Sequence, residues 1–202
     1  MNRIKELILA TGNTHKAAEI KYILKDFPLK IITLKDLPVV PEIIEDGKSF
    51  KENAFKKASA LVKATGKAAF ADDSGLEVDA LSGEPGVYSS RYAGDEGNDE
   101  KNNMKLLQNL MKIPAEGRTA RFRCAIALSL PDNGGFCVEG KCEGRIGFKP
   151  QGSNGFGYDP LFIPDGYEIT FAEISHHEKN RISHRSQALS KFADKFGNLF
   201  CK

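Results

Sequence analysis

The sequence lacks several features that would place it in a specialised class. Its cysteines, Cys124, Cys137, Cys142 and Cys201, show no CxxC spacing, which favours reduced thiols over a zinc site or a disulfide framework. No apolar run approaches the length of a membrane span, and Leu7–Ala10 is too short for a signal-peptide core. A net charge of +2 gives no overall case for nucleic acid or a membrane surface as a partner. We therefore expect a cytoplasmic protein that binds anions only through local clusters.

Familiar ligand motifs are missing as well. The chain has no GxxxxGK[ST] loop, no GxGxxG fingerprint and no histidine spacing typical of a metal site. It also has no internal repeat and no low-complexity tract. What is present is ordinary: 202 residues, 41% hydrophobic and 28% charged, which suits one domain, or one domain with two lobes around a cleft.

Hydrophobic patterns predict alternating strands and helices early in the chain and a hairpin later. Asn13 or Thr14 is a plausible N-cap, and Ser49 with Glu52 forms a capping-box pattern before a helix that Gly66 ends. We expect an α/β fold with a long mixed sheet and flanking helices. The predicted strands are 5–10, 29–34, 68–71 and 76–81, the helices about 15–26, 49–65, 98–112 and 184–196, and the hairpin 119–130 with 135–148.

Thr11–Lys16 lies between the first strand and the first helix. A glycine-bearing turn there presents backbone N–H groups and the positive end of the helix dipole, and Lys16 adds a formal charge. The segment is a candidate phosphate site. A purely structural turn with a surface lysine remains the alternative, because such turns are common.

The acidic segment Asp72-Asp73-Ser74-Gly75 directly follows an apolar strand, and we expect it to form a turn. Ligands of α/β proteins often bind where strands end, and carboxylates there can hold Mg²⁺ or activate water. Successive strand residues point in opposite directions, so we expect different roles for Asp72 and Asp73. A capped turn with solvated acids is the alternative. Glu45, within the acidic stretch 42–46, could complete a metal site, although solvated loops of this kind are common.

Two later segments could contact a ligand. Gly152–Pro160 is rich in glycine, and Phe156 and Tyr158 offer flat faces on which a base could stack, unless this is an ordinary tight loop. Lys179–Ser186 carries three cations and a histidine close to a helix N-terminus, where they are unfavourable for the helix itself. That cost favours an anionic or polar ligand. The neighbouring histidines at 176–177 are expected to be surface residues.

These motifs, taken in order, resemble the non-canonical purine NTP pyrophosphatase family, also called inosine triphosphate or dITP/XTP pyrophosphatases. The resemblance covers about residues 7–196 and includes Gly83–Tyr92. It implies an inosine triphosphatase-like fold with two lobes around a central substrate cleft, usually a homodimer. It also implies Mg²⁺-dependent hydrolysis, with Mn²⁺ as a possible substitute, of ITP, dITP and XTP to the monophosphate and pyrophosphate, which removes deaminated purines from the nucleotide pool.

The resemblance also implies roles for individual residues. Asp73 resembles the general base and a metal ligand, Glu45 the second ligand, and Asp72 a support for the metal or its waters. The remaining residues resemble substrate contacts. They are Thr11, Gly12, Asn13, Thr14, His15 and Lys16 for the triphosphate, Lys57 for a further phosphate contact, Ser74, Phe156 as the stacking face, Gly157, Tyr158 and Asp159 as the base wall, and Lys179, His184 and Arg185.

Physical chemistry agrees with these roles. Cations and a metal ion would stabilise the charge of a triphosphate during cleavage. A donor from Arg185, His184 or a backbone N–H aimed at a 6-keto oxygen would reject adenine by roughly 10⁴-fold. Guanine shares that oxygen, and the sequence does not indicate how it is excluded. Two rival interpretations are a related pyrophosphatase that prefers modified pyrimidines and a nucleotide-binding protein without hydrolytic activity, which would not need the Asp72–Asp73 pair.

Overall fold

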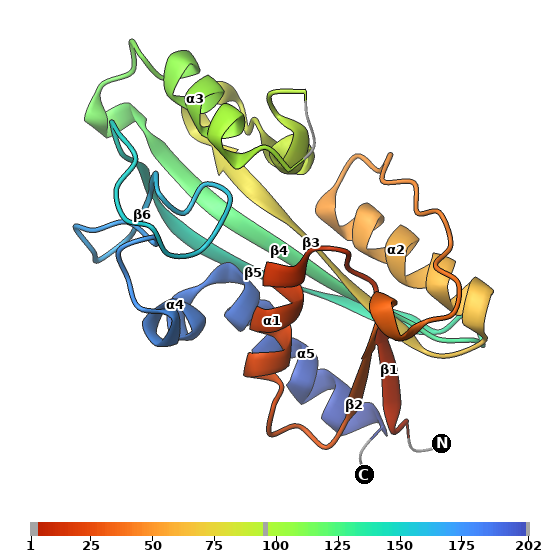
Figure 1. Ribbon diagram of the computed structural model, residues 1–202. Coiled ribbons are helices and arrows are strands. Elements are labelled where there is room, and N and C mark those ends of the chain that lie inside the picture. Colours follow the sequence, from red (N-terminus) through yellow and green to blue (C-terminus); the bar gives the residue numbers. More distant parts are fainter. Residues whose placement is uncertain (1–3, 95–96, 201–202) are drawn as a thin grey trace. The chain divides into compact units, whose positions relative to one another are not determined.

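The computed structural model describes residues 4–94 and 97–200; Cys201 lies outside them. The strands are β1 (Glu6–Leu9), β2 (Lys30–Thr33), β3 (Ala69–Val78), β4 (Thr119–Ser129), β5 (Gly135–Ile146) and β6 (Phe162–Pro164). The α-helices are α1 (Thr14–Ile23), α2 (Phe50–Thr65), α3 (Asp99–Asn109), α4 (His176–Ile182) and α5 (His184–Phe200), as Figure 1 shows.

The strands form one mixed sheet in the order β2-β1-β3-β4-β5-β6. β1 pairs in parallel with β2 and with β3, whereas β5 and β6 are antiparallel. The predicted α/β fold with a mixed sheet and flanking helices is confirmed. β1, β2 and β3 are parallel strands joined through α1 and α2, so their carboxyl ends lie at one edge of the sheet.

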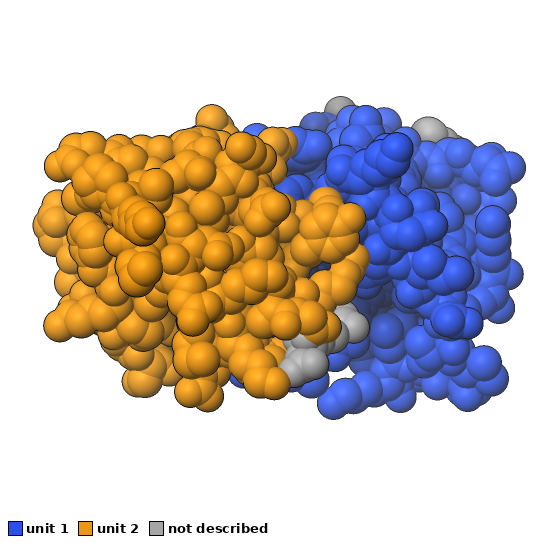
Figure 2. Space-filling model, turned by 90° about the horizontal axis from the view of Figure 1, so that it is seen from above, with its two compact units in different colours: residues 1–73, 124–140, 185–202 blue, residues 74–123, 141–184 orange. Residues whose placement is uncertain are grey.

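The chain divides into two compact units, which are coloured separately in Figure 2. Unit 1 contains residues 1–73, 124–140 and 185–202, and unit 2 contains residues 74–123 and 141–184. The boundaries fall inside β3, β4 and β5, so each of these strands contributes residues to both units.

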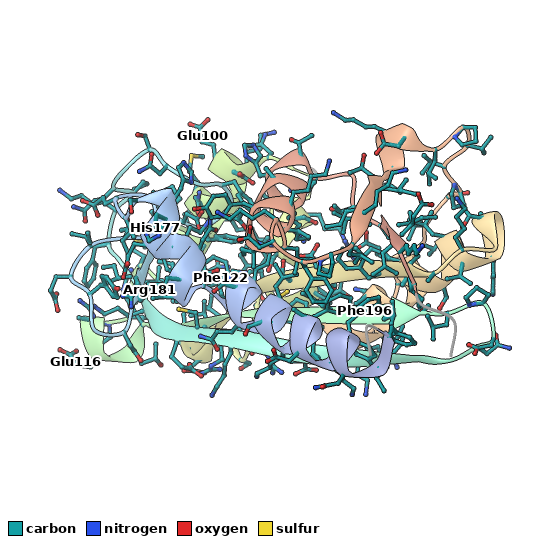
Figure 3. The ribbon with its side chains drawn as sticks, turned by 90° about the horizontal axis from the view of Figure 1, so that it is seen from below. Glu100, Glu116, Phe122, His177, Arg181 and Phe196 are labelled. Atoms are coloured by element: carbon teal, nitrogen blue, oxygen red, sulfur yellow. The ribbon has the colours of Figure 1, made fainter. Side chains whose placement is uncertain are left out.

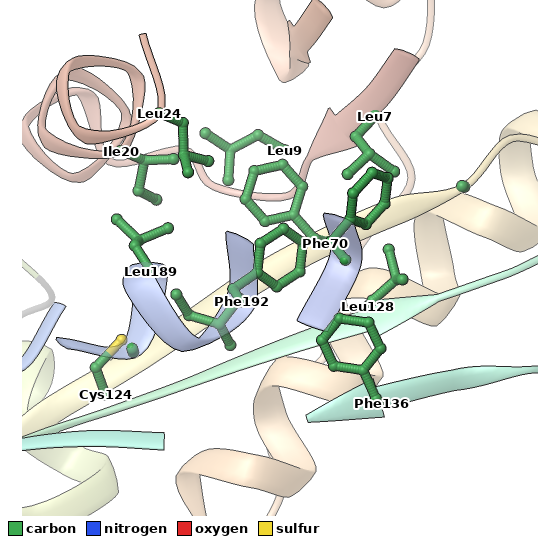
Figure 4. Packing of buried hydrophobic residues seen from close by; sticks show 14 of the residues in the cluster. Leu7, Leu9, Ile20, Leu24, Phe70, Cys124, Leu128, Phe136, Leu189 and Phe192 are labelled. Atoms are coloured by element: carbon green, nitrogen blue, oxygen red, sulfur yellow. The ribbon is translucent and has the colours of Figure 1, made fainter. Parts of the chain in front are cut away.

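Unit 1 has helices on both faces of its part of the sheet, and β1 shows why. Leu7 and Leu9 belong to a core with α1 and α5, while Ile8 and Ala10 pack with α2 on the opposite face. This alternation follows from the two-residue period of a strand. Figure 4 shows the larger core, in which the ring of Phe70 from β3 lies 5.2 Å from that of Phe192 on α5, centroid to centroid.

Unit 2 has its own hydrophobic core. Leu76 and Val78 of β3 pack there with Leu106 of α3 and with Leu110, which follows the last residue of that helix. A cluster of aromatic rings adds to this core, with centroids of Phe122 and Phe162 4.8 Å apart. Each unit therefore buries apolar surface of its own.

The acidic segment at 72–75 is not a turn, and that prediction is wrong. Asp72, Asp73, Ser74 and Gly75 lie within the continuous strand β3, which joins the two shorter strands predicted on either side. Ser-Gly is common in turns, but Gly75 does not adopt a positive φ here. The strand continues because the residues before and after this segment are buried on both faces of the sheet.

The predicted N-caps of the first two helices and the end of the second are confirmed, whereas α1 and α3 end about three residues earlier than predicted and α5 continues to Phe200. The side chain of Asn13 caps α1 by accepting from the Lys16 N–H, and Ser49 caps α2. Gly66 ends α2 in the left-handed conformation, at φ 68°. The short elements α4 and β6 were not predicted. Cys124, Cys137 and Cys142 are free thiols, and within the described residues no helix is long and apolar enough to cross a membrane.

Candidate functional site

The two adjacent aspartates of β3 point to opposite faces of the sheet. Asp72 follows Phe70 at the two-residue spacing and lies on the face covered by α1 and α5, whereas Asp73 follows Ala71 on the face covered by α2. Their exposed fractions are 1% and 7%. A buried carboxylate needs partners, and because the two acids lie on opposite faces, each contacts a different set of cations. The two acids therefore lie in different surroundings, as strand geometry predicts.

Asp72 is held by cations from two helices. Its Oδ2 lies 3.4 Å from the Lys16 Nζ of α1 and 3.2 Å from Nη2 of Arg185 in α5. Arg185, 2% exposed, also binds Glu19 of α1. Burial alone would raise the pKa of Asp72, but Lys16 and Arg185 hold it well below the usual carboxyl range. Asp72 is therefore ionised and links α1 to α5.

Asp73 shares one lysine with the acidic loop before α2. Lys57 Nζ donates to Asp73 Oδ1 at 2.8 Å and to Glu45 Oε2 at 3.1 Å. Burial raises the pKa of Asp73, against the opposing effect of Lys57. The pKa of Lys57 is also raised, since its attraction to Asp73, Asp72 and Glu45 exceeds the effect of burial. The structure thus brings together Glu45, Lys57 and Asp73, as the resemblance implies.

The predicted phosphate segment forms the N-terminus of α1. Thr11 accepts from the Asn13 N–H at 3.2 Å, and Asn13 accepts from the Lys16 N–H at 3.0 Å. Residues 12–15 are exposed, while Lys16 turns back towards Asp72. The first N–H groups of a helix have no acceptor within the helix, so this end can receive an anion. A pocket of about 280 Å³ lies beside the segment and includes Lys35.

A divalent metal fits the donor set of unit 1 only in part. Among the described residues, no group of three or more His, Cys, Asp or Glu side chains is placed to hold a metal ion. Glu45 and Asp73 supply the hard oxygens that Mg²⁺ prefers, and Mg²⁺ can bind through one or two carboxylates while keeping its waters. Asp72 is engaged by two cations instead. The residues that fit are therefore Glu45 and Asp73.

The glycine-rich loop of unit 2 is organised by a buried ion pair. Lys179 Nζ donates to Asp159 Oδ2 at 2.6 Å, and both side chains are at most 4% exposed. The same oxygen accepts from the Phe156 N–H at 2.8 Å, and Lys179 Nζ lies 5.0 Å from the centroid of the Phe156 ring. The predicted residues Phe156, Asp159 and Lys179 are thus brought together, with Phe156 only half-buried.

Tyr158 does not offer a face for stacking, and that prediction is wrong. Its side chain is 3% exposed and belongs to the core of unit 2, and its hydroxyl donates to the Ser89 carbonyl at 2.9 Å. Burial raises the pKa of this phenol. The loop alternates, with Phe156 half-buried and Tyr158 directed inward as an anchor. A single aromatic face therefore remains in this segment.

The cationic segment separates into residues with different environments. Lys179 is directed into unit 2, whereas Arg181 is exposed and paired with Glu178 on α4. His177 and Arg181 lie on this short helix in Figure 3. His184 is 4% exposed and stacks on Phe122, with centroids 4.7 Å apart. His176 and His177 are exposed, as predicted.

Three residues at these sites were not predicted. Glu19 binds Arg185, and Asp99 and Asn103 of α3 contact the backbone of Gly157. Each is a polar residue in an amphipathic helix, and nothing in the local sequence distinguishes it from solvated neighbours. Their partners are 54 to 166 positions away in the chain. Ser74, also predicted, is a half-buried residue of β3 in unit 2.

These features define a class: an α/β protein in which a central strand carries two buried, cation-bound carboxylates beside a helix N-terminus. The chain belongs to the Ham1 family, whose model matches residues 7–195. It is 49% identical over 191 residues to the dITP/XTP pyrophosphatase of Geobacter sulfurreducens, covering 95% of this chain and 96% of that protein. Identity to the Bacillus subtilis protein of that name is 48% over 190 residues, covering 94% and 96%.

Solved structures give the same assignment. The HAM1 protein from Coxiella burnetii matches with a TM-score of 0.88 and 41% identity, covering 96% of this chain and 100% of that chain. The Staphylococcus aureus Ham1 protein matches with a TM-score of 0.86 and 40% identity, covering 96% and 99%. Sequence and fold therefore agree along nearly the whole chain.

Proposed function

We propose that this protein hydrolyses triphosphates of deaminated purines, ITP, dITP and XTP, to the nucleoside monophosphate and pyrophosphate. The observation that carries the proposal is the arrangement on β3. Asp73 lies with Lys57 and Glu45 on one face of the strand, and Asp72 with Lys16 and Arg185 on the other. Family membership and relatives named dITP/XTP pyrophosphatase support the substrate class.

In this proposal, the residues of unit 1 act on the triphosphate. The N-terminus of α1, Lys16 and Lys57 supply positive charge that stabilises developing negative charge on phosphate oxygens. Asp73 accepts the proton of the attacking water. Asp72 keeps Lys16 and Arg185 in place through two ion pairs.

The proposed metal is Mg²⁺, with Mn²⁺ as a substitute, held by Glu45 and Asp73. When bound, a divalent ion supplies charge neutralisation for phosphate oxygens and lowers the pKa of a coordinated water. Lys57 binds both of these carboxylates and would add positive charge beside the phosphates. Removal of divalent ions with a chelator is expected to abolish turnover.

In unit 2, Phe156 is the proposed stacking face for the base. The backbone of Gly157 and the buried Asp159–Lys179 pair form the wall around it. His184 of unit 2 and Arg185 of unit 1 are proposed as contacts that favour a 6-keto purine, because unpaired donors facing the 6-amino group of adenine would be costly. Ser74 is a further proposed substrate contact.

Product analysis tests the proposed reaction. After incubation with ITP and Mg²⁺, IMP and pyrophosphate are expected; IDP with orthophosphate would contradict the cleavage position. A panel of triphosphates tests the base preference. Equal kcat/KM for dITP and for dGTP or dTTP would contradict the substrate class.

We also propose a homodimer, which rests on the family resemblance, and a cytoplasmic location without nucleic-acid or membrane partners, which rests on the composition of the sequence. Sedimentation velocity should give twice the chain mass of 22.2 kDa. A single species at the chain mass across micromolar concentrations would contradict the dimer.

A further inference from the structure

The loop that carries Phe156 is held from the side by α3. The Gly157 N–H donates to Asp99 Oδ2 at 2.6 Å, and Asn103 Nδ2 donates to the Gly157 carbonyl at 2.9 Å. Both polar groups of one residue are thus bound by two side chains of one helix. Asp99 and Asn103 are four positions apart, so they lie on the same face of α3.

These two hydrogen bonds, which we call the α3 clamp, hold a stretch of backbone with unusual φ angles. Gly157 has φ 64° and Gly155 has φ 77°, a region that other residues rarely adopt. Phe156 lies between these two glycines, and glycine-flanked backbone is conformationally permissive. Without external hydrogen bonds, the direction of the Phe156 ring would be poorly determined.

Two further contacts complete the support. The Phe156 N–H is bound by Asp159, which is itself bound by Lys179. α3 is fixed in turn by Asn102, whose side chain accepts from the Ala93 N–H at 2.7 Å and donates to the Ser90 carbonyl at 3.2 Å. The loop is therefore anchored to two separate helices, α3 and α4, within unit 2.

We propose that Asp99 and Asn103 are positioning residues that orient the Phe156 stacking face and thereby set the affinity for the purine base. This inference rests on the proposed function and deepens it. Pre-ordering a loop in its binding conformation lowers the entropy cost of association. We expect the α3 clamp to act on base binding, because both of its hydrogen bonds are made to Gly157, the residue that follows Phe156.

The test compares Asp99→Ala with Asp99→Asn, which keeps an acceptor for the Gly157 N–H. Asp99→Ala should raise KM for ITP about tenfold with kcat within about twofold, because a hydrogen bond to a charged group is lost from the binding site. Asp99→Asn should restore most of the affinity. Glu100→Ala is the matched control: it removes the same charge from the next position of α3, where Glu100 projects outward in Figure 3.

Inhibition by the two products distinguishes an effect on base binding from an effect on phosphate binding, because IMP carries the base and pyrophosphate does not. In Asp99→Ala, the inhibition constant of IMP should rise about as much as KM, while that of pyrophosphate should not change. Asn103→Ala should show the same pattern. A purely structural role would instead lower the thermal midpoint and weaken IMP and pyrophosphate inhibition alike, and that result would overturn the inference.

Failure of the inference can be told apart from failure of the proposed function. If the wild-type protein releases no pyrophosphate from ITP, the proposed function is wrong. If the wild-type protein is active but IMP inhibits Asp99→Ala and the wild type equally, the clamp has no role in base binding, and only the inference is overturned.

Discussion

Asp73 is the residue on which the proposed chemistry depends most directly. Asp73→Asn keeps the size of the side chain and its contact with Lys57 but removes the carboxylate that accepts a proton. We expect kcat for ITP to fall by about 10²–10⁴-fold, as for loss of a general base, with binding of ITP retained. Pyrophosphate release and equilibrium binding measure the two effects separately.

Asp46→Asn is the control for this substitution. Asp46 is an exposed acid next to Glu45 in the loop before α2, paired only with the exposed Lys56 among the interactions described. Exposed pairs contribute about 0–1 kcal/mol, so its stability and activity should stay near wild type. Substantial turnover in Asp73→Asn would remove Asp73 as the base.

Two glycines of the Phe156 loop form a matched pair. A Cβ at Gly155 would lie 2.0 Å from Asp159 Oδ2, whereas a Cβ at Gly157 would meet no atom within 4 Å. Both residues have positive φ, so either alanine costs roughly 1–2 kcal/mol in backbone conformation. Gly155→Ala must also displace Asp159 from the Phe156 N–H.

We therefore expect both variants to lose stability in urea unfolding, and Gly155→Ala to raise KM for ITP clearly more than Gly157→Ala. Equal KM values in the two variants would show that the Asp159 contact does not matter for substrate binding.

At this scale, sequence reasoning predicted residue types better than partners. The opposite directions of Asp72 and Asp73 follow from strand geometry alone. That Arg185 would reach back across 113 positions to Asp72 could not be predicted, because a long-range ion pair leaves no local pattern. The burial of Tyr158 was missed for a similar reason: two aromatics in a glycine-rich loop look equivalent until a core is formed around one of them.

At the scale of elements, α2 orders the acidic loop that carries Glu45. The Gly47 N–H donates to Asn53 Oδ1 at 2.8 Å, and the Lys48 N–H to Glu52 Oε2 at 2.7 Å. Both acceptors belong to the first turns of α2. Asn53 is fully buried, so the first of these bonds is shielded from water.

Asn53→Ala should lower the free energy of unfolding by about 1–3 kcal/mol, because the buried Gly47 N–H loses its acceptor. Lys56→Ala, which removes an exposed partner of the same loop, should cost less than about 1 kcal/mol. Urea unfolding of both variants measures the difference. Similar costs for the two would show that the loop does not depend on Asn53.

Helices with regular apolar spacing could be predicted from the sequence, whereas a polar segment inside a continuous strand could not. The helices α1 and α2, with caps at Asn13 and Ser49, follow from spacing and capping residues. Sequence patterns predict two strands where the structure has the single strand β3, because Asp-Asp-Ser-Gly is polar and typical of turns. The strand nevertheless continues through this segment, and both acids are buried. Cations supplied by other elements make this burial tolerable, and local propensity does not include them.

At the scale of the whole molecule, ligand binding should appear as stability. A ligand present at 100 times its Kd stabilises the folded state by about 2.7 kcal/mol. For a chain of this size, each kcal/mol raises the thermal midpoint by about 2–4 °C. With Asp73→Asn, which should bind without turnover, saturating ITP and Mg²⁺ should raise the midpoint by roughly 5–10 °C.

The same experiment with ATP tests whether this stabilisation depends on the base. ATP offers the same triphosphate but presents an amino group where ITP has a keto oxygen, so the donors proposed to face that oxygen would lose their acceptor. At equal concentration, ATP should shift the midpoint far less than ITP, and chelation of Mg²⁺ should reduce both shifts. Equal shifts with ITP and ATP would mean that contacts with the triphosphate alone govern binding, and the base-contacting roles proposed for Phe156, His184 and Arg185 would then be wrong.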